Sequence, residues 1–501
     1  MRDPEYGQDH RRNPGKNPEK DPAKRQGRAS GRDHRRKKRD SGKTVLILLS
    51  SAVLVLAVLV PAVSFFPQLK SVLLQVGDPA VPENGLFQAG TSASLENGEV
   101  ILPSGGAEKT RQGAEEEQTI LIVRETGDQP AAEPESETEA PPKYTENENT
   151  RRIRRMHTQE GTEQEDITLC FAGDILFDDR YAVMASLLQR SGQTPAVENA
   201  FDDGLLSLMR GADVFMVNNE FPYSDRGSPL PEKKFTFRAD PSYAELLTAM
   251  GADLAALANN HLYDYGEEAL LDTLDTLDAL KIPCTEADGS SAFLEGLPTV
   301  GAGRNLDEAA APFYFTNGKI KIGFVCATQI ERMGNPDTKG ATESSPGVFR
   351  CLNSQNLVRV IRSMRSECDF IVAYLHWGTE STAQTDGFQR KLAQDAAQAG
   401  ADLIIGDHPH VLQEIGLAEG VPVVYSLGNF LFNSGAQDTC LVMASLDPET
   451  AELKSLRFIP ARQEGCRTTL LAGSEQTRVL EYMRSISEVS IDGNGYIEWE
   501  E

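Results

Sequence analysis

The chain has 501 residues, enough for a large hydrophobic core and more than one kind of segment, and its net charge at pH 7 is −26. Residues 1–43 hold 15 of the 49 Lys+Arg and 7 of the 75 Asp+Glu, so this head carries +8 and the rest of the chain −34. Because nucleic-acid binding requires a basic face, the acidic body argues against a nucleic-acid partner.

The N-terminal part predicts a single-pass membrane anchor. Residues 1–43 are rich in Arg, Lys, Pro and Gly, and we expect a disordered cytoplasmic tail. The 23 uncharged residues 44–66 would form a helix that crosses a hydrocarbon core of about 30 Å. The basic block 35–43 predicts a cytoplasmic N-terminus and an extracellular C-terminal body in the cell membrane. A cleaved signal peptide, with Ala62-Val63-Ser64 as processing site, is the alternative.

Residues 67–165 are acidic and of low complexity, and they predict a disordered stalk. Pro and Glu are plentiful, as in 129–150, and the apolar periodicity is poor, so a packed core is not expected there. The basic cluster 151–155 at the end of this region either leans on an anionic polymer or lipid or is a solvated run of charges.

From Asp166 onward, short β-prone runs alternate with amphipathic helical stretches. This alternation predicts an α/β domain with a largely central sheet over 166–501. We expect strands at 167–173, 213–219, 253–259, 321–327, 369–375, 402–406 and 421–432. We expect helices at 241–251, 266–280 and 387–400. The tripeptide Gly-Ala-Asp at 211–213, 251–253 and 400–402 indicates three similar helix-to-strand turns.

The seven cysteines are scattered along the chain and include no CxxC pair. Their spacing therefore indicates neither a disulfide scaffold nor a zinc knuckle. We expect most of them to be small buried apolar residues. An odd number of cysteines in an exported chain leaves at least one thiol free unless two chains are cross-linked.

Polar residues with useful chemistry recur just after the predicted strands of the body. Six residues share this position: Asp174, Glu220, His261, His376, His408 and His410. Because the loops at the carboxyl ends of strands in an open α/β sheet share one crevice, we expect these side chains to converge. Taken singly, each has a structural explanation as a turn residue, a cap or a hydrogen-bond partner.

The chemistry of this set predicts a site for one or two divalent metal ions. Imidazole and carboxylate groups together are the ligands of Zn, Mn or Fe, and Asn260 beside His261 adds an amide oxygen. A bridging carboxylate with several histidines holds two ions about 3.5–4 Å apart. His408-Pro409-His410 is the most specific element, because the proline stiffens the backbone between two imidazoles.

Six blocks of the body resemble, in the right order, the signature blocks of the CapA/PgsA poly-γ-glutamate capsule-biosynthesis family. They are FAGDILFDDR (171–180), NNEFP (218–222), LANNHLYDYG (257–266), LHWGTE (375–380), GDHPHVLQ (406–413) and YSLGNFLF (425–432). The resemblance covers about 167–435. The family is a branch of the calcineurin-like metallophosphoesterases, so the resemblance implies a four-layer α/β/β/α sandwich with a C-terminal extension.

The resemblance also implies a role for each polar residue. Glu220 would bridge two ions. The other ligands would be Asp174 and His410 at the first ion, and Asn260, His376 and His408 at the second. His261 would face the substrate as an acid or a stabiliser of charge.

The first block departs from the wider superfamily, in which its motif is Asp-x-His. Here Leu176 stands two residues after Asp174, so one ligand of the first ion is missing, and phosphoesterase activity is left open. Arg180 and Asp264 also match the family blocks. Arg180 would grip an anionic substrate and Asp264 would orient an imidazole, with a structural ion pair as the alternative for each.

Three functions fit these features. The first is a membrane-anchored extracytoplasmic protein in the synthesis, export or anchoring of poly-γ-glutamate or a related anionic capsule polymer, with other capsule synthesis or export proteins as partners. The second is a divalent-metal-dependent phosphoesterase or other hydrolase at the cell envelope. The third is a non-catalytic module in which the metal holds the polymer, since the acidic body alone would repel a polyanion.

Overall fold

The computed structural model describes residues 148–153, 165–192, 194–285, 291–330 and 338–499. The expected cytoplasmic tail, the expected span at 44–66 and nearly all of the expected stalk lie outside the described residues. Within those ranges, no helix is both long and apolar enough to cross a membrane.

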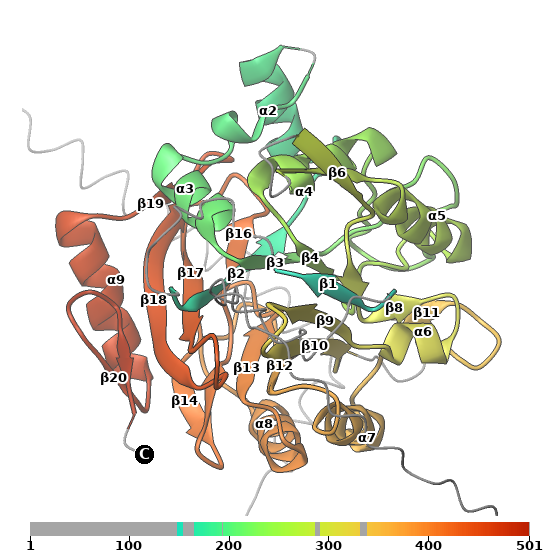
Figure 1. The fold of residues 1–501 in the computed structure, drawn as a ribbon. Coiled ribbons are helices and arrows are strands. Elements are labelled where there is room, and N and C mark those ends of the chain that lie inside the picture. Colours follow the sequence, from blue (N-terminus) through green and yellow to red (C-terminus); the bar gives the residue numbers. More distant parts are fainter. Residues whose placement is uncertain (1–147, 154–164, 193, 286–290, 331–337, 500–501) are drawn as a thin grey trace, which may run out of the picture. The chain divides into compact units, whose positions relative to one another are not determined.

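The first of two large β-sheets has the strand order β1-β9-β10-β12-β13-β15-β14 (Figure 1). Its central strands β10, β12, β13 and β15 run parallel, as buried strands linked through helices do. The strands are β1 Thr150–Arg152, β9 Phe313–Thr316, β10 Lys321–Thr328, β12 Phe370–His376, β13 Leu403–Asp407, β14 Ile415–Ala418 and β15 Val421–Val424.

The second sheet has the order β19-β18-β17-β2-β3-β4-β7, and β16 pairs with β2. Strands β2, β3, β4 and β7 are parallel, while β17 joins β2 in the antiparallel sense. The strands are β2 Ile167–Ile175, β3 Val214–Asn219, β4 Leu254–Ala256, β7 Thr299–Val300, β16 Asn429–Leu431, β17 Gln437–Leu446, β18 Leu453–Gln463 and β19 Thr468–Leu470.

Helices flank both sheets, and three small strand pairs complete the described part. The α-helices are α2 Ala182–Ser191, α3 Asp203–Gly211, α4 Glu245–Met250, α5 Glu267–Asp278, α6 Leu306–Ala310, α7 Gln355–Met364, α8 Gly387–Ala399 and α9 Gly473–Ile486. The short elements are η2 Val197–Asn199, η3 Pro241–Ala244, and the pairs β5 Lys281–Thr285 with β6 Ser291–Glu295, β8 Ala302–Gly303 with β11 Gly347–Val348, and β20 Ser490–Ile491 with β21 Ile497–Glu498.

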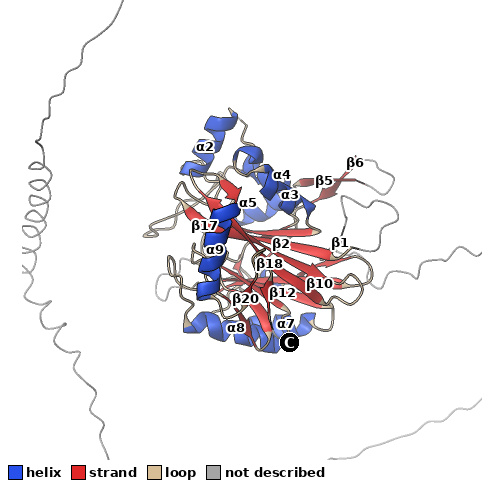
Figure 2. Cartoon of the chain, turned by 90° about the vertical axis from the view of Figure 1, so that its left-hand side faces the viewer, coloured by secondary structure: helices blue, strands red, loops and turns tan. Residues whose placement is uncertain are grey.

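The two sheets pack against each other between helical layers, as Figures 1 and 2 show. Alternate residues of one strand face different cores, because successive side chains of a strand point to opposite faces. In β12, Val372 and Tyr374 belong to the core shared with the second sheet, and Ile371 and Ala373 belong to the core that includes α7 and α8. The predicted mixed α/β fold is confirmed.

The run 421–432, which the sequence predicts as one strand, divides between the two sheets. Strand β15 belongs to the first sheet, and β16 lies beside β2 in the second. The residues between them include Gly428, whose φ of 71° is a left-handed conformation that favours glycine. This change of sheet carries Asn429 to the end of β2.

The three Gly-Ala-Asp turns share a hydrogen-bond pattern that aligns neighbouring parallel strands. Asp213 accepts the backbone N–H of Thr168 at 2.8 Å, Asp253 that of Phe215 at 2.9 Å, and Asp402 that of Ile371 at 2.7 Å. Each aspartate precedes one strand and accepts the N–H of the second residue of the strand beside it. Adjacent strands thus start at a defined register.

Residues 148–153 correct the expectation of a disordered stalk up to residue 165. Strand β1 pairs in parallel with β9 at the edge of the first sheet. The Arg151 side chain donates to the backbone carbonyls of Glu295 and Gly296, both at 3.0 Å. This arginine of the basic cluster is therefore bound to the domain. Strand β1 can pair at this place because an edge strand offers unpaired backbone groups.

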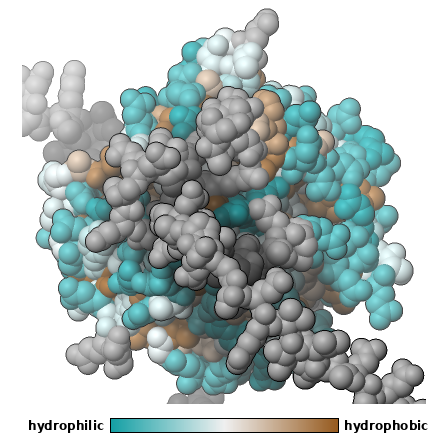
Figure 3. Space-filling view, in the orientation of Figure 1, coloured by the Kyte–Doolittle hydropathy of each residue, from teal (hydrophilic) through white to brown (hydrophobic). Residues whose placement is uncertain are grey.

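The interior and the surface of the described part follow the expected polarity. Six cysteines are buried free thiols, as predicted: Cys170, Cys326, Cys351, Cys368, Cys440 and Cys466. On the face drawn in Figure 3, the described residues are mostly hydrophilic, with apolar residues scattered among them. Isolated apolar residues of this kind are normal for a protein surface.

We predict that Asp253→Ala lowers the free energy of unfolding by about 1–3 kcal/mol, because the N–H of buried Phe215 loses its acceptor. Asp253→Asn keeps an acceptor oxygen at the same place and should retain most of the stability. Chemical unfolding of the purified protein measures both variants. Equal stability of Asp253→Ala and wild type would contradict the proposed role of the turn.

Candidate metal centre

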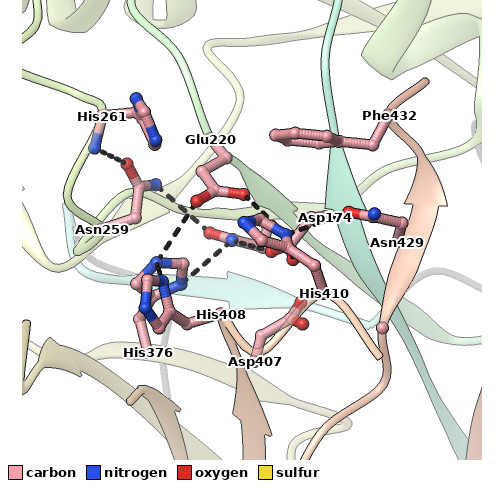
Figure 4. Close-up of polar contacts among 12 residues, drawn as sticks. Asp174, Glu220, Asn259, His261, His376, Asp407, His408, His410, Asn429 and Phe432 are labelled. Atoms are coloured by element: carbon pink, nitrogen blue, oxygen red, sulfur yellow. Dashed lines mark hydrogen bonds and ion pairs between the residues drawn. The ribbon is translucent and has the colours of Figure 1, made fainter. Parts of the chain in front are cut away.

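The cluster forms where parallel strands of both sheets end (Figure 4). Asp174 is near the end of β2, Glu220 follows β3, and Asn260 lies after β4 in the second sheet. His376 is the last residue of β12, and His408 follows β13, in the first sheet. The strand ends of two packed sheets thus bring together residues that are up to 236 positions apart, as in the pair Asp174 and His410.

One group of ligands consists of Glu220, His376 and His408, whose ligand atoms all lie within 4.8 Å of one another. His376 Nε2 lies 3.4 Å from Glu220 Oε1, 3.1 Å from His408 Nδ1 and 2.8 Å from Asn260 Oδ1. Two imidazoles, a carboxylate and an amide oxygen therefore face one point.

A second group consists of Asp174, Glu220 and His410. His410 Nδ1 lies 2.9 Å from Asp174 Oδ2 and 3.9 Å from Glu220 Oε2. Glu220 belongs to both groups, which is the position of a bridging carboxylate between two ions.

The residues present fit one or two divalent ions. Within the described part of the chain, both carboxylate oxygens of Glu220 and Oδ1 of Asp407 are buried without a hydrogen-bond partner. Burying a carboxylate without hydrogen-bond donors costs free energy, and a cation bound beside Glu220 and Asp407 would offset this cost. Such an ion would polarise a phosphoryl or carboxyl oxygen of a substrate and acidify a bound water.

Metal binding needs neutral imidazole and ionised carboxylate, and His376, His408 and Asp174 are held in these forms. Burial lowers the pKa of His376 to about 3 and that of His408 well below its usual value. Burial would raise the pKa of Asp174, but the hydrogen bond and charge of His410 outweigh it and lower the pKa to about 2. Burial, with Asp174 and Asp407 nearby, raises the pKa of Glu220. Burial would lower the pKa of His410, but the hydrogen bond and charge of Asp174 outweigh it and raise the pKa, so a cation competes with protons at Glu220 and His410.

The segment His408-Pro409-His410 is strained. His408 has φ of 99° and His410 has φ of 59°, values that residues with a Cβ rarely adopt. Strain of this kind costs about 1–3 kcal/mol per residue and persists where the surrounding structure imposes it. Here it directs two imidazoles of one short segment to the two ligand groups.

His261 lies beside the ligand groups without belonging to either. Its Nδ1 is 2.6 Å from Asp264 Oδ2, and its ring centroid is 4.2 Å from that of Phe237. Asp264 also accepts from Lys233 Nζ at 2.6 Å. Asp264 thus contacts both an imidazole and a lysine, so its contacts match both alternatives that the sequence left open, the orienting group and the structural ion pair. Lys233, which the sequence did not single out, holds the segment before Phe237 against this turn.

Arg180 is not among the contacts of the cluster. Its guanidinium binds Asp178 and Tyr265 and donates to the carbonyl of Thr236 at 2.7 Å. Of the two readings that the sequence left open for Arg180, these contacts match the structural ion pair.

Several polar residues of the cluster escaped the sequence analysis. Asn259 accepts the N–H of His261 and holds the turn after β4, and Asn218 donates to Asp174 Oδ1 at 2.6 Å. Asp407 accepts from Tyr374 at 3.0 Å, and exposed Glu380 lies near His408 and His410. Asn218, Asn259, Asp407 and Glu380 all lie near the end of, or just after, strands that are followed by a predicted ligand or that end in one. Their position at the strand ends could therefore have identified them from the sequence.

Fold and site together define a two-sheet α/β protein with a carboxylate and imidazole cluster at its strand ends. The sequence model of the family described as "Bacterial capsule synthesis protein PGA_cap" matches residues 168–434, and the chain belongs to this family. The predicted resemblance to CapA/PgsA proteins is confirmed.

Named relatives carry matching descriptions. The chain is 27% identical to the PGA biosynthesis protein CapA of Bacillus subtilis over 290 residues. This aligned region covers 56% of this chain and 68% of that protein. It is 26% identical over 328 residues to the capsule biosynthesis protein CapA of Bacillus anthracis, which covers 63% and 72%. A probable polyglutamine synthesis accessory protein of Mycobacterium tuberculosis is 25% identical over 265 residues, or 50% and 66% of the two chains.

Solved structures with some likeness include a phosphatase from Mycoplasma pneumoniae, with a TM-score of 0.34, 14% identity and coverage of 60% of this chain and 96% of that one. The sulfate thiohydrolase SoxB of Thermus thermophilus has a TM-score of 0.33, 14% identity and coverage of 65% and 61%. At these scores the likeness carries no argument about activity.

We predict that removal of divalent cations by a chelator lowers the midpoint of thermal unfolding by about 5 °C or more, because Glu220 loses its compensating charge. His376→Ala should respond much less than wild type. Lys391→Ala, which removes an exposed side chain from α8, should respond as wild type does. Identical midpoints with and without chelator, together with no bound metal, would contradict the metal centre.

Proposed function

We propose that this protein is a membrane-anchored extracytoplasmic component in the synthesis, export or anchoring of poly-γ-glutamate or a related anionic capsule polymer. Its membership of the capsule synthesis family and the descriptions of its relatives support this proposal. The observation that carries it is the buried cluster around Glu220, which offers a cation-binding site to polymer carboxylates. Other capsule synthesis and export proteins are the proposed partners.

Charge explains why the polymer would need this centre. The chain beyond residue 43 carries −34, so most of its surface repels a polyanion. Divalent ions at the cluster would reverse the sign of the local potential. A carboxylate-bearing polymer would then be held at the strand ends rather than elsewhere on the acidic body.

A basic segment beside the cluster supports the same substrate class. Arg238 lies 4.2 Å over the ring of Tyr265, and Lys234 lies 4.7 Å over that of Phe235. No carboxylate of the described residues forms an ion pair with either cation. Phe237, adjacent to Arg238, packs on His261, so the segment flanks the metal centre. We propose that Arg238 and Lys234 contact the polymer where it leaves the centre.

The second candidate function is a divalent-metal-dependent phosphoesterase or other hydrolase at the cell envelope. The sharing of Glu220 between two ligand groups favours it, because such a pair of ions stabilises both oxygens of a displacement. His261, paired with Asp264 beside the ligands, is placed to act as an acid or to stabilise charge. A non-catalytic module that holds polymer through its metal is the third.

We predict that the purified full-length protein binds poly-γ-glutamate only with divalent ions. His376→Ala should lose metal and weaken polymer binding about tenfold or more, because a ligand of the second position is gone. Arg238→Gln should weaken polymer binding severalfold without changing metal content. Arg457→Gln is the matched control. Arg238 and Arg457 each lie over a tyrosine ring and donate to a backbone carbonyl, but Arg457 is on β18.

The same samples separate the three functions. Metal-dependent turnover of phosphodiester or γ-glutamyl substrates by wild type, lost in His376→Ala, would establish the hydrolase. Metal-dependent binding without turnover would favour assembly or holding of polymer. Binding that persists unchanged after metal removal would contradict both the polymer-binding centre and its proposed charge logic.

The proposed arrangement is a basic cytoplasmic tail (1–43), a membrane helix (44–66), a stalk that ends before the domain, and the family domain outside the cell. Protease added to intact cells should remove the domain and leave a membrane-protected N-terminal fragment. Protection of the domain would contradict the extracellular placement. Release of a chain that begins near Ala62-Val63-Ser64 into the medium would instead establish the cleaved signal peptide.

A further inference from the structure

We propose that Asn429 is a metal ligand of the first position, together with Asp174, Glu220 and His410. The sequence leaves this position short of a ligand, because Leu176 stands where the superfamily motif has histidine. Leu176 is buried in the hydrophobic core and offers no donor atom. The inference rests on the metal centre but is independent of which polymer the protein handles.

Backbone contact between two glycine-containing segments brings Asn429 to the cluster. Strand β16 runs parallel to β2 with Asn429 directly opposite Asp174. A Cβ at Gly173 would lie 2.0 Å from the carbonyl oxygen of Gly428, so only glycine at 173 permits this approach. The Asp174 N–H donates to that carbonyl at 3.3 Å, which ties the two segments together.

The amide of Asn429 is oriented by its own hydrogen bonds. Its Nδ2 donates to Gln437 Oε1 at 2.9 Å, on the side away from the cluster. Its Oδ1 is thereby turned toward His410 Nδ1, 3.0 Å away. Figure 4 shows Asn429 and Asp174 approaching His410 from the same side.

Three oxygen atoms therefore face the same nitrogen. His410 Nδ1 lies 2.9 Å from Asp174 Oδ2, 3.0 Å from Asn429 Oδ1 and 3.9 Å from Glu220 Oε2. When this nitrogen binds an ion, it has no proton to donate. Asn429 is 2% exposed, so its amide oxygen would then be buried without a donor, at a cost of about 1–3 kcal/mol, unless it also faces the ion.

The assignment gives the two positions different chemical preferences. The first would have three oxygen ligands and one nitrogen, a set that suits Mn²⁺ or Mg²⁺. The second, with His376 and His408 beside Glu220 and Asn260, suits Zn²⁺ or Fe²⁺ better. A carboxamide also binds less strongly than the imidazole it replaces, so the first ion should exchange more readily.

The test is the metal content and Mn²⁺ affinity of the full-length protein, without any activity assay. Wild type should hold two ions per chain. Asn429→Ala should hold one, with Mn²⁺ affinity at the weaker position reduced more than about 100-fold, beyond the range of residues that only orient a ligand. Asn429→Asp, which keeps an oxygen at the same place, should restore the second ion.

Asn433→Ala is the matched control. Asn433 lies on the same segment, also reaches Gln437 Oε1, at 3.4 Å, and hydrogen-bonds Gln463 rather than the cluster. It should keep two ions. Retention of the second-position ion in Asn429→Ala shows that the variant is folded. Two ions bound normally by Asn429→Ala, or a loss of affinity within about 10–100-fold, would overturn the assignment. A failure of polymer binding in wild type would leave these metal measurements unaffected.

Discussion

The Glu220 carboxylate, buried without a hydrogen-bond donor, is the constraint around which the site is built. Removing a charge from water is costly unless it is paired. His376 and His410 approach its two oxygens from opposite sides, and both belong to the strand ends of the first sheet or to the segment that follows them. The two sheets must therefore be held in a defined relation for the charge to be tolerable at all.

That relation is established at both ends of the strands. At their starts, Asp213, Asp253 and Asp402 align neighbouring strands by accepting backbone N–H groups. At the ends that carry the cluster, Gly173 allows the chain around Gly428 to touch β2. The strained backbone of His408 and His410 lies at the same ends, and such strain is typical of sites where side chains must be held in one position.

The surroundings of the cluster connect the fold to the proposed handling of an anionic polymer. Lys233 is almost wholly buried against Asp264, which holds the segment that carries Phe237 beside His261. The guanidinium of the following Arg238 forms no ion pair with a carboxylate of the described residues and donates to the carbonyl of Arg226 at 2.8 Å, whereas that of Arg180 is paired with Asp178. Asp178 thus forms an ion pair with one of two nearby arginines and contacts the other only through its backbone N–H.

The sequence by itself determined the alternation of strands and helices, the family, and most residues of the cluster, because strand-end histidines and acids follow local pattern. It could not predict that 421–432 divides between two sheets, since both halves are equally β-prone and only long-range pairing separates them. It also missed β1, because three residues at a sheet edge are stabilised by a partner strand and not by their own periodicity. Only the tertiary structure placed Asn429 opposite Asp174, because this contact joins distant segments through packing that no local spacing encodes. Arg180 and Asp178 are close in the sequence, and the fold decided only that their ion pair lies away from the cluster, where Arg180 also contacts Tyr265 and Thr236.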